Sequence, residues 1–405
     1  MKSIMDKNVI KEVLERSVEK IYPSKDALEK AMLGGRHLKI YLGVDPTGPH
    51  LHLGHLTNIL ILKKLQQLGH EIIFLIGDFT AQIGDPTDKL AARKPLSQKE
   101  IKENYKTFKK QVSRIIKFSG TNAVKVKFNS KWLSKMKFAD VVRLAQNFTV
   151  QQMIQRDMFQ ERIKADKPIG VHEFLYPLMQ GYDSVAMDVD MEIGGNDQTF
   201  NMLVGRDLAK IYKNKEKFVL TTKLLINPKT DRKLMNKSEG GLINLDDKPE
   251  DIFGKVMAIA DEAMFEIAEL STEMPKDKIN SLKNSVLNNK MNPRDAKLEI
   301  AKAVVQTIYD KKTAGESKEE FLKLFAKHEK PEEIQTCKLA AANYKLVDLL
   351  VETKLASSKG EARRLIEQGG VKINDEKKTD PNGIIQISKE IILQVGKRHF
   401  LKVSR

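Results

Sequence analysis

The feature that most constrains the fold is a short strand pattern that runs through a Pro/Gly turn into a helix pattern. Lys39–Val44 is the predicted strand, the next four residues read Asp-Pro-Thr-Gly, and apolar residues recur at helical spacing from Leu53 to Leu60. His52 and His55 therefore lie in the first turn of the predicted helix. Because a helix N-terminus offers unpaired N–H groups and partial positive charge, this turn is predicted to bind phosphate.

Other interpretations of this histidine motif (residues 52–55) are two surface histidines or half of a metal site. Zinc needs three or four His, Cys or carboxylate ligands. The chain has one cysteine, Cys337, and no His-Glu-x-x-His pattern. No metal ligand is therefore predicted. Gly54, between the histidines, allows a nucleotide to approach the backbone closely.

A second motif lies nearly two hundred residues later and reads Lys-Leu-Met-Asn-Lys-Ser, ending at Ser238. The histidine motif and this lysine motif (residues 233–238) resemble the H-I-G-H and K-M-S-K-S signatures of class I aminoacyl-tRNA synthetases. Lys237 and Ser238 match the second signature, whereas Leu234 replaces its first lysine and Asn236 its first serine. Taken alone, the segment also fits a solvated basic loop.

Segments between the two motifs resemble tyrosyl-tRNA synthetases. In that family, residues matching Tyr41 and Asp183 hydrogen-bond the phenol of the substrate, others hold its ammonium group, and a glutamine lies near its carboxylate. Three of the matching residues are four and three positions apart, so they share one face of a helix, although a polar stripe on an amphipathic helix gives the same spacing. The implied tyrosine-binding residues are Tyr41, Asp85, Tyr176, Gln180, Asp183 and Gln198.

The resemblance also implies an ATP site and a set of catalytic side chains. Thr47 and the two histidines would stabilise the phosphate in the transition state, and three cations would neutralise the departing pyrophosphate. Two of these cations lie in residues 85–93, a charged loop that is equally consistent with a mobile lid. Mg²⁺ would travel with ATP, without an assigned protein ligand. The implied catalytic residues are Thr47, His52, His55, Lys89, Arg93 and Lys237. The implied ATP-binding residues are Gly43, Asp45, Gly54, Gly195, Asp197, Met235, Lys237 and Ser238.

Strand and helix patterns alternate up to about residue 240, with a second buried strand predicted at residues 71–76, and this alternation indicates an α/β fold. The resemblance implies a Rossmann-like class I synthetase nucleotide-binding domain in residues 1–243, with an inserted dimerisation segment at about 120–190. Its carboxyl-end residues would meet at one edge of a parallel sheet. A capping box at residues 97–100 predicts a helix that continues to Phe118, and Asp197 is predicted to cap the helix that follows it.

The remaining chain is predicted to form an α-helical domain and a small α+β domain. The resemblance places a helical anticodon-binding domain at residues 244–330, where the sequence alone supports only a small helical bundle. Residues 331–344 are assigned to a linker and residues 345–405 to the last domain. This last domain resembles the S-four RNA-binding module, although its mixed-charge helix also fits an ordinary solvated face. The implied RNA-binding residues are Lys359, Arg363, Arg364 and Lys372.

Composition limits the class of protein and its partners. The formal net charge of +16 favours a polyanionic partner. The sequence has no apolar run of about 18 residues and no signal-peptide pattern, so no membrane association is expected. A single cysteine excludes an intrachain disulfide and fits a reducing cytoplasm.

The sequence therefore predicts a homodimeric enzyme that activates L-tyrosine with ATP and transfers it to tRNA(Tyr). Three alternatives are a tryptophanyl-tRNA synthetase, a smaller nucleotidylyltransferase, and a non-enzymatic RNA-structure-binding protein derived from a synthetase. Tyr41 with Asp183 argues against the first, and the added domains argue against the second. The histidines and Lys237 argue against the third, which Leu234 leaves open.

Overall fold

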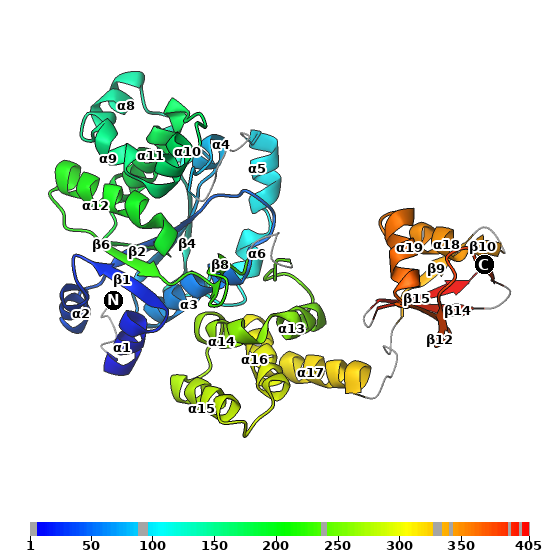
Figure 1. Ribbon diagram of the computed structural model, residues 1–405. Coiled ribbons are helices and arrows are strands. Elements are labelled where there is room, and N and C mark those ends of the chain that lie inside the picture. Colours follow the sequence, from blue (N-terminus) through cyan, green and yellow to red (C-terminus); the bar gives the residue numbers. More distant parts are fainter. Residues whose placement is uncertain are drawn as a thin grey trace. The chain divides into compact units, whose positions relative to one another are not determined.

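The computed structural model divides the chain into two compact units, residues 1–314 and 315–405, each described here by itself (Figure 1). Within them the structure describes residues 6–87, 96–235, 241–326, 334–339, 343–387, 390–396 and 399–404.

The first unit is built on a six-stranded sheet in the order β1-β6-β5-β2-β3-β4. Strand β1 is antiparallel to β6, and the other neighbours are parallel. The predicted strand before the histidine motif and the next predicted strand, at residues 71–76, are confirmed as β2 and β3. The strands are β1 (Val18–Tyr22), β2 (Lys39–Val44), β3 (Glu71–Ile76), β4 (Lys125–Phe128), β5 (Met191–Gly195) and β6 (Phe218–Thr222).

The order of the strands creates a switch point between β2 and β5. From β2 the chain continues outward to β3 and β4, whereas from β5 it continues in the opposite direction to β6. Right-handed crossovers then place the connecting helices on opposite faces of the sheet. A crevice opens beyond the carboxyl ends of β2 and β5, the place where open α/β sheets bind ligands.

Helix α3 (Leu53–Gln67) follows β2 and is buried along most of its length, because it contacts the sheet on one side and the later helix α14 on another. Helix α11 (Val171–Met187) packs against α12 (Thr199–Lys213). The other helices of this α/β part are α1 (Lys7–Glu15), α2 (Lys25–Leu33), α4 (Thr80–Ile83), α5 (Gln98–Tyr105), α6 (Phe108–Val112), α7 (Ser130–Leu133), α8 (Phe138–Ala145), α9 (Val150–Ile154) and α10 (Asp157–Lys164).

The capping box before α5 is confirmed, but the predicted length of this helix is wrong. The Ser97 hydroxyl accepts a hydrogen bond from the Glu100 backbone N–H, and the Glu100 carboxylate accepts one from Ser97 N–H. Helix α5 ends at Tyr105, and a second helix, α6, begins at Phe108. The hydroxyl of Thr107 donates to a backbone carbonyl of the segment before α3, which ties the chain down where the helix breaks.

Helices from residue 249 to 308 belong to the first unit rather than forming a separate compact body. They are α13 (Pro249–Ala258), the 3-10 turn η3 (Asp261–Ala263), α14 (Met264–Ser271), α15 (Lys276–Leu287) and α16 (Pro293–Ile308). Helix α16 contacts α13, α14 and α15, and α14 contacts α3, so their apolar faces join the α/β part. Helix α17 (Lys311–Ala326) contains the boundary between the units. None of the described helices is long and apolar enough to cross a membrane.

The second unit is an α+β module around a five-stranded sheet in the order β12-β11-β14-β15-β9. The stretch predicted as a linker contributes β9, which pairs in parallel with β15, and the start of β10, which pairs with β13. The elements are β9 (Thr336–Lys338), β10 (Asn343–Lys345), α18 (Leu346–Glu352), α19 (Lys359–Glu367), β11 (Val371–Ile373), β12 (Glu376–Lys378), β13 (Ile384–Gln386), β14 (Ile391–Val395) and β15 (His399–Ser404).

Candidate active site

A cavity of about 510 Å³ lies at the carboxyl ends of β2 and β5. It brings together every described residue that was predicted to bind tyrosine or ATP or to take part in catalysis. Lys89, Arg93, Lys237 and Ser238 lie outside the described residues. The predicted residues that line the cavity are Tyr41, Gly43, Asp45, Thr47, His52, Gly54, His55, Asp85, Tyr176, Gln180, Asp183, Gly195, Asp197, Gln198 and Met235.

Tyr41 and Asp183 lie at the closed end of the cavity, where both are almost completely buried. The Asp183 carboxylate accepts hydrogen bonds from Trp132 Nε1 (2.7 Å) and Asn129 Nδ2 (3.2 Å). Burial raises the pKa of Asp183 well above its usual range, and these two donors oppose that rise. Burial, with the nearby Glu192 and Asp183 carboxylates, raises the pKa of Tyr41, so its hydroxyl keeps its proton.

Acceptors gather on another side of the cavity. The Tyr176 hydroxyl donates to Asp45 Oδ2 (2.8 Å), and Gln198 Nε2 donates to Asp85 Oδ2 (2.7 Å). Gln180 comes from the same face of α11 as Tyr176, as its spacing predicts. Carboxylates and amide oxygens in this arrangement suit a bound ammonium group, which has three protons to donate.

The two histidines cap α3 with their ring nitrogens. His52 Nδ1 accepts a hydrogen bond from Gly54 N–H (3.2 Å), and His55 Nδ1 accepts one from His52 N–H (3.2 Å). Burial lowers the pKa of His52 to about 4 and that of His55 well below its usual range, so both rings are neutral near pH 7. A neutral imidazole carries one proton, and because both Nδ1 atoms accept, that proton lies on Nε2. Each histidine is therefore an Nε2–H donor.

Asp197 does not cap α12, so that prediction is wrong. It lies in a 3-10 turn, η1 (Asn196–Gln198), and its carboxylate pairs with Lys233 Nζ (2.9 Å) of the lysine motif. Lys233 also lines the cavity. The two-stranded β7–β8 ribbon (Ile226–Asn227 and Arg232–Lys233) positions this lysine.

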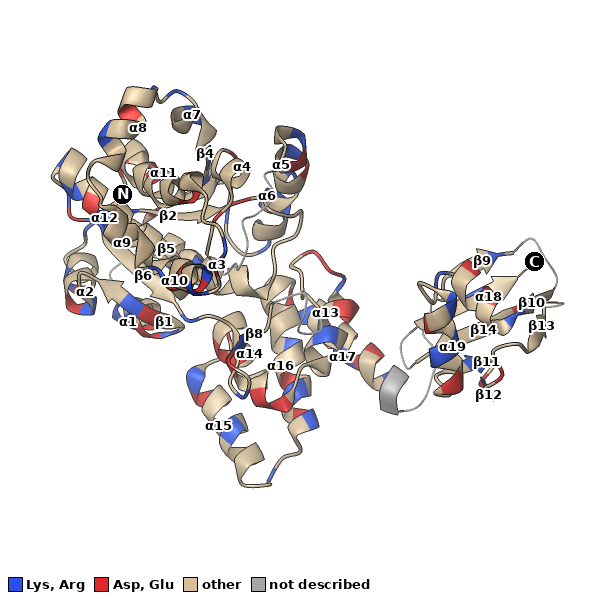
Figure 2. Cartoon of the chain, turned by 45° about the horizontal axis from the view of Figure 1, so that its top comes forward, with Lys and Arg blue, Asp and Glu red and all other residues tan. Residues whose placement is uncertain are grey.

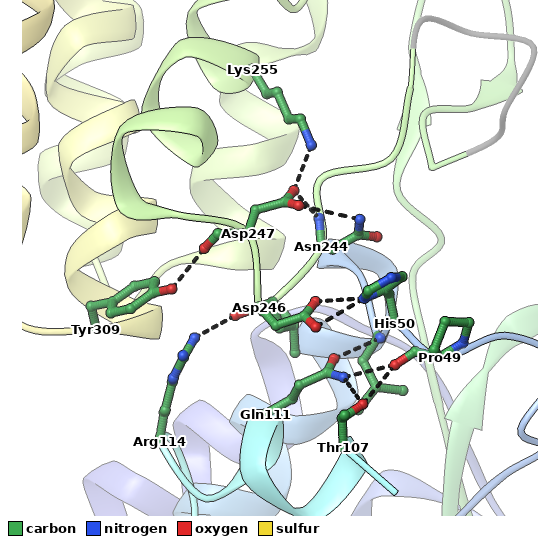
Figure 3. Close-up of polar contacts among 12 residues, drawn as sticks. Pro49, His50, Thr107, Gln111, Arg114, Asn244, Asp246, Asp247, Lys255 and Tyr309 are labelled. Atoms are coloured by element: carbon green, nitrogen blue, oxygen red, sulfur yellow. Dashed lines mark hydrogen bonds and ion pairs between the residues drawn. The ribbon is translucent and has the colours of Figure 1, made fainter. Parts of the chain in front are cut away.

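The backbone that follows the lysine motif runs antiparallel beside the histidine motif. Leu53 N–H donates to Ile243 O (3.1 Å), and Leu245 N–H donates to Leu51 O (2.8 Å). Side chains just after α6 and α16 and a histidine before α3 hold the same segment, as Figure 3 shows. These contacts join His50 Nδ1 to Asp246 (2.9 Å), Arg114 to Leu245 O (2.8 Å) and the Tyr309 hydroxyl to Asp247 O (2.7 Å). The two motifs are thus one structural unit despite their separation in sequence.

Several cavity residues were not found by sequence reasoning. Asn129 follows β4 at the carboxyl edge of the sheet, a position that could have marked it. Glu192 is a buried carboxylate within the apolar strand β5, which is also an unusual position for a charge. Gly77 has no such signal: a Cβ there would lie 1.9 Å from Asp45 Oδ1, so only glycine leaves room for this carboxylate.

Among the residues that the structure describes, no three His, Cys, Asp or Glu side chains cluster as a metal site. In the second unit, the predicted RNA-binding residues Lys359, Arg363 and Arg364 are exposed on α19, and Lys372 is half-buried on β11 (Figure 2). Lys359 pairs with Asp348 (2.7 Å).

Comparison with known proteins assigns the family. Residues 33–326 match the family described as tRNA synthetases class I (W and Y), and residues 327–403 match the tyrosine–tRNA ligase SYY-like C-terminal domain. The tyrosine–tRNA ligase of Carboxydothermus hydrogenoformans is 42% identical over 97% of each chain, and that of Legionella pneumophila strain Philadelphia 1 is 44% identical over 96% of each. The chain belongs to the tyrosine–tRNA ligases.

Solved structures of the tyrosyl-tRNA synthetases share the fold. A C-terminally truncated mitochondrial tyrosyl-tRNA synthetase from Aspergillus nidulans has a TM-score of 0.65, covers 78% of this chain and 94% of its own, and is 22% identical. The Archaeoglobus fulgidus tyrosyl-tRNA synthetase, solved with L-tyrosine, has a TM-score of 0.60 at 22% identity and covers 77% of this chain and 99% of its own. Both likenesses support the class I synthetase fold.

Proposed function

We propose that the cavity at the switch point activates tyrosine with ATP and that the chain then transfers the tyrosyl group to tRNA(Tyr). The observation that carries this assignment is the joint presence of Tyr41 and Asp183 at the closed end of the cavity. One keeps a proton to donate and the other is a carboxylate that accepts, so the pair suits a phenol, which does both.

In the first step, a tyrosine carboxylate oxygen attacks the α-phosphorus of ATP, and the bond to the bridging oxygen breaks to release pyrophosphate. Asp85, Tyr176 and Gln180 hold the substrate ammonium, and Gln198 lies near its carboxylate. The Nε2–H groups of His52 and His55 donate to the phosphate oxygens as negative charge accumulates. Neutral donors give this stabilisation without holding the products by net charge.

The adenosine and the leaving pyrophosphate have separate partners in this proposal. Gly43, Asp45, Gly54, Gly195, Asp197 and Met235 surround the nucleotide, and Thr47 joins the histidines at the phosphates. Lys237, Lys89 and Arg93 are assigned to the pyrophosphate, and Ser238 to ATP, from their sequence motifs. Mg²⁺ enters with ATP and is held by its phosphates, where it offsets their negative charge.

In the second step, a hydroxyl of the 3′-terminal ribose of tRNA attacks the tyrosyl carbonyl, and AMP leaves. Catalysis depends on positioning and charge stabilisation, without a covalent enzyme intermediate. The exposed cations Lys359, Arg363 and Arg364, with Lys372, are proposed to contact tRNA phosphates.

Pyrophosphate exchange into ATP tests the substrate assignment, measured with each of the twenty amino acids in turn. Exchange that depends on tyrosine supports the proposal, and exchange driven by tryptophan, or by none of them, overturns it. Charging of tRNA(Tyr) transcripts then tests the second step.

We further propose that the enzyme is a homodimer that associates through helices between residues 120 and 190. Phe138 and Val171 are 85% and 78% exposed there, and Val142, Val150 and Ile163 are exposed on the helices α8, α9 and α10 (Figure 1). Exposed apolar side chains concentrated in one region mark an association surface.

Sedimentation tests this interface: Phe138→Asp should shift the protein from dimer to monomer, whereas Leu287→Asp on α15, also exposed, should not. A wild-type monomer would refute the proposal.

The proposed location is the cytoplasm, since one cysteine forms no intrachain disulfide. Fractionation of cells expressing the tagged chain checks it.

A further inference from the structure

A buried lysine lies behind the cavity, outside its lining. Lys217 immediately precedes β6 and is completely buried. Its Nζ donates to Ser184 Oγ (2.7 Å) and to Met202 O (3.2 Å), and it forms an ion pair with Glu192. An ammonium group has three protons, so these three partners use all of them. Lys217 therefore acts within the protein and not on a ligand.

The lysine fixes the direction of the next hydrogen bond. Because Ser184 Oγ accepts from Lys217, its own proton must go to another acceptor. Tyr41 Oη lies 3.0 Å away and Glu192 Oε2 lies 3.5 Å away. Hydroxyl hydrogen bonds are normally 2.5–3.0 Å long, so the shorter contact, to Tyr41, is the stronger of the two and is assigned the Ser184 proton. Tyr41 then accepts from Ser184, so its own proton is left for the neighbouring Glu192 carboxylate or for a phenol oxygen in the cavity.

The partner of the lysine fixes the orientation of a second cavity residue, Gln180. Glu192 Oε1 accepts a hydrogen bond from Gln180 Nε2 (3.1 Å). A carboxylate has only acceptors to offer, so Gln180 must turn its NH₂ group toward Glu192. Its Oε1 accepts from Asn201 Nδ2 (3.0 Å), and the second lone pair of this oxygen remains for one more donor.

Stability alone does not account for this buried ion pair. Removing two charges from water costs several kcal/mol per ion, and their attraction rarely does more than offset that cost. Burial lowers the pKa of Lys217, which the Glu192 carboxylate opposes. A methionine and a leucine of similar volume would fill the space without that cost.

We propose that Lys217 and Glu192 set the donor and acceptor directions at both ends of the tyrosine subsite. Through Ser184, Lys217 makes the Tyr41 hydroxyl a donor to the phenol oxygen. Through Gln180, Glu192 keeps an amide oxygen facing the substrate ammonium. Lys217 and Ser184 are positioning residues that determine specificity through Tyr41. The inference rests on the proposed tyrosine-binding function of the cavity.

The test is a double-mutant cycle read as the ratio of kcat/KM for tyrosine and phenylalanine in pyrophosphate exchange. Ser184→Ala leaves the Lys217–Glu192 pair in place and should lower the ratio about three- to tenfold, the range for one neutral hydrogen bond, with the KM for ATP unchanged. In a Tyr41→Phe background the same change should leave the ratio unaltered. Equal losses in both backgrounds, or no loss in the first, would overturn the proposed hydrogen-bond relay from Lys217 through Ser184 to Tyr41.

Two substitutions of the lysine sharpen the result. Lys217→Gln keeps a donor for Ser184 and should retain more selectivity than Lys217→Met, which has none. If either variant fails to fold, the Ser184 cycle still decides the question. Ser271→Ala, at a buried serine of α14, is the matched control and should not change the ratio.

The KM for tyrosine tests the part of the proposal that concerns the substrate ammonium. Glu192→Gln lets the neighbouring Gln180 amide reverse, and should raise the KM for tyrosine while the KM for ATP stays constant. An unchanged KM for tyrosine would remove this half of the proposal. If the unsubstituted enzyme shows no preference for tyrosine, the proposed function fails. If it does prefer tyrosine and the cycle is additive, only the relay fails.

Discussion

Replacing Asp183 by asparagine removes the charge of this side chain and keeps its shape. The Asp183 carboxylate accepts hydrogen bonds from Trp132 and Asn129. The side-chain amide of Asn129 cannot flip, because its Oδ1 accepts from Phe79 N–H (2.9 Å) and its Nδ2 donates to Thr80 Oγ1 (3.0 Å). The new amide has one oxygen for two donors, so its NH₂ group must face one of them. It has no charged acceptor left for the phenol.

The expected loss follows from that single hydrogen bond. A hydrogen bond to a charged group contributes about 1.5–3 kcal/mol, so kcat/KM for tyrosine should fall roughly ten- to a hundredfold. Phenylalanine has no hydroxyl, so its kcat/KM should hardly change. Pyrophosphate exchange with both amino acids measures the ratio. A ratio that stays at the wild-type value would show that Asp183 does not contact the phenol, and the tyrosine assignment would lose its main support.

The pH dependence gives a second measurement on the same variant. Burial raises the pKa of Asp183, so the accepting carboxylate forms only above that raised pKa, and kcat/KM for tyrosine should increase with pH through it. Between the unfolded and folded pKa values the native state binds more protons than the unfolded state. Stability therefore falls as pH rises through this window. Asp183→Asn should abolish both trends, measured as kcat/KM for tyrosine and the midpoint of thermal unfolding across the pH range.

Three further predictions concern the phosphates and the second unit. His55→Ala should slow adenylate formation about a hundred- to a thousandfold and leave tyrosine affinity, measured by equilibrium dialysis, unchanged. His55→Gln keeps an N–H donor and should lose less rate. A tenfold weaker tyrosine affinity at a normal rate would contradict this prediction. Lys237→Ala should slow adenylation more than Lys233→Ala in single-turnover assays, and the reverse order would assign the pyrophosphate to Lys233. Removing residues 327–405 should leave tyrosine-dependent pyrophosphate exchange unchanged. The same truncation should weaken tRNA charging and reduce the salt dependence of charging. Unchanged charging at low tRNA concentration would exclude an RNA-binding role for these residues.

Local patterns predicted much of the α/β part. Apolar runs bounded by turns predicted β2 and β3, and the Ser97–Glu100 capping box predicted the start of α5, because these features depend on neighbouring residues. The end of α5 was not predictable in this way. It depends on a hydrogen bond from Thr107 to Pro49 O, which is 58 residues away.

The cavity shows the same division between local and distant information. Motifs identified residues that line the cavity, because those motifs are short and ordered along the chain. Glu192 and Lys217 meet only when β5 and the residue before β6 become neighbours in the sheet. Asp197 was assigned as a cap from its position before a helix, whereas its true partner, Lys233, lies on a distant ribbon. Pairings of this kind need the strand order as well as the sequence.

The parallel pairing of β9 with β15 has a consequence for how the chain folds during synthesis. Strand β15 lies between β14 and β9 in the sheet, so an element from the end of the chain occupies an inner position. During translation, residues 1–314 emerge first, and domains generally fold as units from the N-terminus. The second unit cannot complete its sheet until its last strand leaves the ribosome. A nonsense codon at residue 399 would therefore remove an inner strand from the second unit while leaving the first unit complete.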